Sequence, residues 1–230
     1  MRLREVFRFE LEYRWRSIWL FAVIMLLFAA WMSGATADGA EQFNAPERIA
    51  GFAIIIAMPG ILVSAAIFGD AALRDFQTEM HPFLFTSPLQ KRELLTGRFL
   101  AACTINLAVL ILALVGFAAI SHLAPMSPGK VGPFRLIAYV QAFVLFTLPN
   151  LFIIGALLFS IAALARQAMP VYLGGIAFFI AYLFAVNAFE HAQNPLLSVV
   201  TDPLGALSLI RLTQPWTLAE QNTQLVGFPP

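Results

Sequence analysis

Apolar residues fill five long stretches of the chain, and the charged residues fall between them. The stretches cover residues 17–33, 49–69, 99–121, 136–165 and 171–187, and none of them contains Asp, Glu, Lys or Arg. A transmembrane helix needs roughly 20 consecutive, mostly apolar residues, and a charge at the centre of the bilayer is costly. The pattern therefore predicts an all-α fold, a polytopic transmembrane helical bundle of five helices over residues 17–189.

The first 16 residues show a different, amphipathic pattern. At helical spacing they carry an apolar stripe and a separate charged stripe, formed by Leu3, Phe7, Leu11, Trp15 and Ile18 and by Arg4, Arg8, Glu12 and Arg16. Glu10 with Arg14, and Glu12 with Arg16, have the spacing of ion pairs one helical turn apart. We expect an N-terminal interfacial amphipathic helix over residues 1–16. A plain basic flank that only sets the topology would use the same residues and is an equal alternative.

Composition supports a membrane protein, because 60% of the residues are hydrophobic and only 12% are charged. An average soluble domain is about half apolar and about a quarter charged. If the N-terminus is inside, ten of the 14 basic residues lie in internal segments. The positive-inside rule then places the N-terminus in the cytoplasm and the tail, residues 190–230, in the extracytoplasmic space.

Few polar residues interrupt the apolar stretches. Asn106, Gln141 and Asn150 are the largest, and they either form hydrogen bonds between helices or line a translocation path. Pro59 and Pro149 lie at mid-membrane depth, where each frees a backbone carbonyl and should kink or break its helix. The one cysteine, Cys103, excludes an intramolecular disulfide.

The longest connection between spans, residues 70–98, is too patterned to be a simple spacer. We expect a short helix that ends before Pro82, and a second helix that begins near Thr86-Ser87-Pro88. Such a surface element offers apolar side chains to a groove on a cytosolic partner. The pattern therefore predicts a coupling loop, which connects the spans to that partner. The candidate coupling residues are Arg74, Asp75, Glu79, Met80, His81, Phe83 and Phe85.

The stretch Thr86–Arg98, TSPLQKRELLTGR, resembles the entry into the third span of ABC type-2 exporter permeases, and the order of the parts is similar along nearly the whole chain. The tail from Asp202 to Thr223 resembles a subgroup that can be fused to a zinc aminopeptidase-like domain. That domain is absent from this sequence, which has no H-E-x-x-H motif. Family members usually have six spans, so we expect a truncated, split or fused permease that lacks the sixth.

The resemblance implies a permease subunit in the bacterial cytoplasmic (inner) membrane. Its expected partners are a cytosolic ATP-binding subunit, a second permease half in a homo- or heterodimer, and membrane lipid; it implies no cofactor, no metal and no nucleic acid. The only lysines, Lys91 and Lys130, do not end a phosphate-binding loop, so we expect no ATPase or peptidase activity and no enzyme. The alternative is a membrane scaffold or assembly factor without transport. An intramembrane hydrolase is disfavoured, because the spans hold no His, Asp or Glu.

Overall fold

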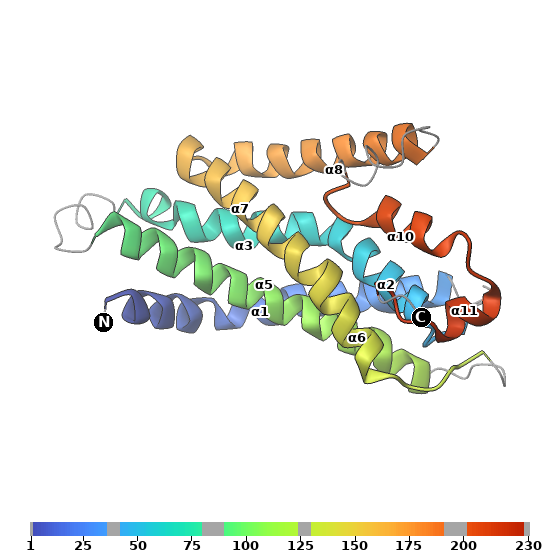
Figure 1. Cartoon of the computed structure of the whole chain (residues 1–230). Coiled ribbons are helices and arrows are strands. Elements are labelled where there is room, and N and C mark those ends of the chain that lie inside the picture. Colours follow the sequence, from blue (N-terminus) through green and yellow to red (C-terminus); the bar gives the residue numbers. More distant parts are fainter. Residues whose placement is uncertain (1, 36–41, 80–89, 124–129, 191–201, 228–230) are drawn as a thin grey trace.

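A computed structural model describes residues 2–35, 42–79, 90–123, 130–190 and 202–227 (Figure 1). Within these ranges every regular element is helical, and none is a strand. The elements are α1 (Arg2–Ala35), α2 (Pro46–Ile55), α3 (Ala57–Gln77), α5 (Lys91–Leu123), α6 (Leu136–Ala142), the π-helix η1 (Phe143–Thr147), α7 (Leu148–Ala165), α8 (Ala168–Glu190), α10 (Ala206–Thr213) and α11 (Leu218–Thr223).

The all-α polytopic bundle predicted from the sequence is confirmed. Among the described residues, four helical stretches are long and apolar enough to cross a membrane: Pro46–Gln77, Lys91–Ile120, Leu136–Ala165 and Ala168–Ala188. A fifth stretch is α1, which bends by 61° between Leu3–Trp15 and Ile18–Met32. The outermost helix, α8, leaves large apolar side chains exposed, Met169 and Phe184 among them. An apolar surface of this extent fits a membrane-embedded protein.

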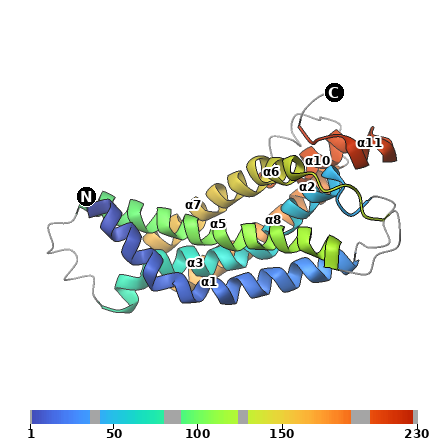
Figure 2. The same ribbon diagram turned by 90° about the horizontal axis from the view of Figure 1, so that it is seen from below.

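Helix α1 packs along α5 over most of its length, so the N-terminal segment belongs to the bundle (Figure 2). Gly97 of α5 permits this approach near the start of α1. A Cβ atom at Gly97 would lie 2.8 Å from Val6 Cγ1, which is closer than real Cβ atoms come to a neighbour. The Leu3–Trp15 segment can therefore lie against α5 only because residue 97 has no side chain.

Two of the spans are distorted just before a proline. Because Pro59 has no N–H for the carbonyl of Ile55, the second span breaks at Ile56, between α2 and α3. Pro149 likewise has no N–H for the carbonyl of Leu145, and the preceding turn widens into η1, where Leu148 N–H donates to Phe143 O five residues earlier. Both distortions lie where the sequence places a proline inside an apolar stretch.

The connections between helices gather at two opposite ends of the bundle. The start of α1, the end of α3 and the start of α5 share one end, and Arg166, after α7, joins them there with its guanidinium 5.1 Å from the centre of the Phe76 ring. At the other end Phe43 N–H donates to Lys130 O at 2.8 Å. The start of α1 and helix α11 lie at opposite ends of the bundle (Figure 2). The described helix ends on either side of each connection fall into the same two groups that the positive-inside rule assigns.

The C-terminal segment folds back onto the second of these ends. Asp202 accepts hydrogen bonds from Tyr182 Oη of α8 at 3.0 Å and from the backbone N–H of Gly205 at 2.9 Å. Asn150 Nδ2 of α7 donates to Leu204 O at 3.1 Å, and Leu204 is almost fully buried. These contacts hold the start of the described C-terminal segment, residues 202–227, against α7 and α8, and α10 itself packs against α2 and α8.

Gly155 of α7 gives a test of the packing between α3 and α7. A Cβ atom there would lie under 3.0 Å from three atoms of the Phe68 ring, which is itself fully buried. Gly155→Ala should therefore lower the free energy of unfolding by about 1–3 kcal/mol, measured as a lower thermal midpoint in detergent. Gly60→Ala is the matched control, because its Cβ would meet Met25 and Leu110 at ordinary contact distances of 3.6 and 3.7 Å. An equal loss in both variants would contradict the packing described here.

Candidate functional site

Six charged side chains from three helices meet at the end of the bundle that holds the start of α1. They form an ionic cluster composed of Glu10 and Arg14 from α1, Asp70, Arg74 and Asp75 from α3, and Arg98 from α5. Three of these side chains are acidic and three are basic, so their formal charges cancel. The cluster is the densest polar arrangement in the part of the chain that the structure describes.

Glu10 is the centre of the ionic cluster. Its carboxylate pairs with Arg14 one turn further along α1 and accepts from Arg74 Nη2 at 2.5 Å and Nη1 at 3.0 Å. Arg98 Nε reaches the same carboxylate at 3.2 Å. The Glu10 side chain is only 1% exposed, so a single buried carboxylate holds three guanidinium groups from three different helices.

The outer members complete the charge balance. Arg98 Nη2 donates to Asp75 Oδ1 at 2.5 Å, and Arg14 Nε donates to Asp70 Oδ2 at 2.9 Å. Asp75 is buried, whereas the Asp70 side chain is 43% exposed and lies at the solvent edge. Each arginine thus contacts two acidic groups or, for Arg74, one acidic group and an aromatic surface.

Arg74 also lies close to two aromatic rings of α1. Its guanidinium carbon lies 4.7 Å from the centre of the Tyr13 ring and 5.2 Å from that of Phe9. A guanidinium group close to an aromatic face gains about 0.5–2 kcal/mol, depending on its desolvation. The exposed rings of Phe9 and Tyr13 therefore cover Arg74 at the surface of the bundle.

The ionic cluster ties together both ends of the connection between α3 and α5. Arg74 and Asp75 lie in the last turn of α3, and Arg98 lies two turns into α5. All of them connect, directly or through Arg98, to Glu10. The ionic cluster therefore joins the two described flanks of this connection to each other and to α1.

Two of the seven coupling residues expected from the sequence, Arg74 and Asp75, belong to this cluster. Glu79 is exposed and follows the end of α3, where its φ of 55° is left-handed, a conformation that ends helices and is uncommon for a residue other than glycine. Met80, His81, Phe83 and Phe85 lie outside the described residues. Sequence reasoning missed the central role of Glu10 and the part played by Arg98, although both lie close to the same end of their apolar stretches.

The intramembrane polar residues are largely committed to contacts between helices. Asn106 Nδ2 of α5 donates to Ser64 Oγ of α3 at 2.6 Å, and Asn150 reaches Leu204 as described above. Gln141 is buried, and neither of its amide atoms has a hydrogen-bond partner among the described residues. For Asn106 and Asn150 the contacts fit the interhelical interpretation of these residues.

A small cavity of about 10 Å³ lies between the two distorted spans. Gly60 and Ser64 come to it from α3, whereas Thr147 and Asn150 come from η1 and α7. Thr147 Oγ1 is buried and has no hydrogen-bond partner in the described ranges. Ile56, where the second span breaks, also lines the cavity. The break and the π-helix therefore lie on either side of a small group of polar side chains in an otherwise apolar core.

The site offers no evident place for a metal. Within the described ranges no group of three His, Cys, Asp or Glu side chains could hold a metal ion, and the acidic members of the ionic cluster are interleaved with arginines. Comparisons with protein-family models, with curated proteins and with solved structures found no match for this chain.

Removal of the Glu10 charge tests the ionic cluster. Glu10→Gln keeps the shape of the side chain but leaves three guanidinium groups without their shared carboxylate. Loss of one partner from a buried ionic arrangement costs about 3–5 kcal/mol, which should appear as a large drop in the thermal midpoint of the detergent-solubilised protein.

Glu12→Gln is the matched control in the same helix. Glu12 pairs with Arg8 at 2.8 Å, but the two side chains are 64% and 80% exposed, so the loss of this pair should change stability little. If the two variants unfolded at the same temperature, Glu10 would not be the centre of the packing at this end.

Proposed function

We propose that the chain is the membrane-spanning permease subunit of an ATP-binding cassette exporter, coupled to a separate ATPase through residues 70–98. The observation that carries the proposal is the ionic cluster, which links both flanks of that connection to α1 through Glu10. The resemblance of Thr86–Arg98 to type-2 exporter permeases supports the same role.

The cluster residues connect the ends of residues 80–89 to three helices. A cytosolic ATP-binding subunit that grips residues 80–89 acts on the end of α3 and the start of α5. Because Arg74 and Arg98 share one buried carboxylate, these two helices and α1 respond as one body. The distortions at Ile56 and at η1 lie further along the spans, where they let the opposite halves of the helices move separately.

In this proposal the chain supplies the passage and its partners supply the energy. The ATP-binding subunit hydrolyses ATP, a second permease half completes the passage, and membrane lipid surrounds the bundle. The protein lies in the bacterial inner membrane, with its N-terminus and the ionic cluster on the cytoplasmic side and its C-terminal tail on the extracytoplasmic side. The excess of basic residues at the cluster end favours this orientation.

Co-purification with an ATPase tests the proposal. The chain is co-expressed with a cytosolic ATP-binding subunit, and two quantities are measured: how much ATPase is recovered with the chain and how far its activity is stimulated. The triple variant Met80→Ala, Phe83→Ala and Phe85→Ala should reduce both at least about tenfold, because a few apolar anchors carry most of the energy of such an interface.

The control for this experiment is an equally apolar triple variant far from the loop. Ile176→Ala, Ile180→Ala and Leu183→Ala remove exposed side chains from α8 and should leave recovery and stimulation unchanged. Equal recovery of the ATPase with both triple variants would contradict the coupling role. The alternative, a membrane scaffold that holds a partner complex without transport, would then take its place.

A further inference from the structure

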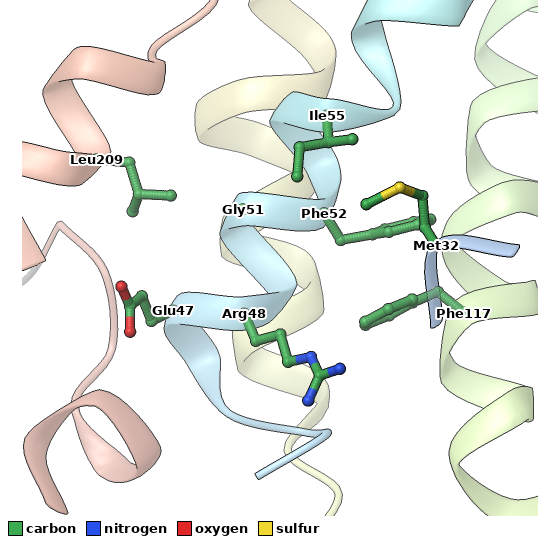
Figure 3. Close-up of a pocket in the computed structure, with 8 residues that line it drawn as sticks. All are labelled: Met32, Glu47, Arg48, Gly51, Phe52, Ile55, Phe117 and Leu209. Atoms are coloured by element: carbon green, nitrogen blue, oxygen red, sulfur yellow. The ribbon is translucent and has the colours of Figure 1, made fainter. Parts of the chain in front are cut away.

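A pocket of about 180 Å³ opens at the end of the bundle opposite the ionic cluster (Figure 3). Four elements far apart in the sequence form its walls. Its apolar lining residues are Met32 of α1, Gly51, Phe52 and Ile55 of α2, Phe117 of α5 and Leu209 of α10. The pocket thus exists only because the C-terminal segment folds back over α2.

Stacked aromatic rings form one wall of the apolar part of the pocket. The rings of Phe52 and Phe117 stack with centres 4.0 Å apart, and Phe43 also stacks with Phe117, at 4.8 Å. Gly51 leaves room between this stack and α10, because a Cβ atom there would still be 3.9 Å from Leu209 Cδ2. An apolar cavity of about 150 Å³ is large enough to bind benzene, so the pocket accepts a short apolar group.

Two opposite charges flank this apolar space. Glu47 and Arg48 are consecutive residues in the first turn of α2, and their side chains diverge to the two sides of Gly51 (Figure 3). The Arg48 guanidinium carbon lies 4.8 Å from the centre of the Phe43 ring, which fixes the group beside the aromatic stack. Since the apolar stretch of the second span begins at residue 49, both charges lie at the level of the membrane surface.

We propose that this pocket binds a membrane lipid whose headgroup carries both a phosphate and a primary ammonium, the phosphatidylethanolamine class. Arg48 pairs with the phosphate, Glu47 accepts hydrogen bonds from the ammonium, and the first carbons of one acyl chain enter beside Gly51. The large exposed side chains of Leu27 and Trp31 on the last turns of α1, the helix that contributes Met32, make this side of the bundle a lipid-facing surface. The proposal depends on membrane embedding and not on a permease role.

A lipid-dependent stability measurement tests the site. The full chain in detergent receives phosphatidylethanolamine, phosphatidylcholine or phosphatidylglycerol with identical acyl chains, and its thermal midpoint is recorded. A saturating specific ligand should raise the midpoint by about 5–10 °C. We expect the largest rise with phosphatidylethanolamine, because phosphatidylcholine has no N–H donor for Glu47 and phosphatidylglycerol has no ammonium group.

Variants separate the two parts of the site. Glu47→Gln should abolish the preference for phosphatidylethanolamine over phosphatidylglycerol, and Arg48→Gln should weaken the response to both, because both carry a phosphate. Gly51→Leu fills the apolar space and should remove the specific rise. Gly51→Ala adds a methyl group that would meet Leu209 Cδ2 at an ordinary contact distance of 3.9 Å. It narrows the pocket without a clash and should reduce the rise even if Gly51→Leu fails to fold.

Thr104→Leu, which introduces the same leucine side chain at an exposed position of α5, is the control and should keep the full lipid response. Equal rises with the three lipids would overturn the proposal. So would a phosphatidylethanolamine preference that survives Glu47→Gln, or an undiminished rise with phosphatidylethanolamine in Gly51→Ala.

Discussion

A carboxylate that is buried among apolar helices must keep its cationic partners, and this requirement organises one end of the molecule. Glu10 is 1% exposed and contacts Arg14, Arg74 and Arg98, which belong to three helices. In surroundings of low polarity an unpaired charge is far more costly than in water. The three helices can therefore separate at this end only if several charges are exposed at once, and Gly97 removes the side chain that would hold α1 away.

The rest of the bundle is packed by apolar contacts and interrupted at defined points. Fully buried residues such as Phe68, Ile61 and Leu158 form the core between α3, α7 and α8, whereas Pro59 and Pro149 break or widen two spans near the middle. The molecule thus combines a charged end, where ion pairs join three helices, with a middle where two spans are broken or widened. At the opposite end the tail closes over α2 and creates the pocket between Gly51 and Leu209.

The sequence predicts the positions of the helices better than it predicts the contacts that the helix ends make. The stretch expected at 136–165 has the same limits as the helical stretch Leu136–Ala165, whereas the one expected at 49–69 is part of Pro46–Gln77, because Asp70, Arg74 and Asp75 continue the helix into the ionic cluster. Helical spacing groups Trp15 with the apolar stripe, and Trp15 is exposed in the structure, but the same spacing gives no sign that Glu10 is buried. Hydrophobic periodicity cannot reveal that charges from three segments neutralise one another, nor that α10 returns to cover α2.

In the proposed topology the chain crosses the membrane an odd number of times, so the ionic cluster and the tail lie on opposite sides of the bilayer. In a Cys103→Ser background, single substitutions Glu12→Cys and Glu220→Cys place one thiol near each end at exposed positions. Intact cells are then treated with a maleimide that does not cross the membrane. The proposed topology predicts that the thiol at residue 220 is labelled in intact cells and that the thiol at residue 12 is labelled only after the membrane is opened. Labelling of both thiols, or of neither, in intact cells would contradict this topology.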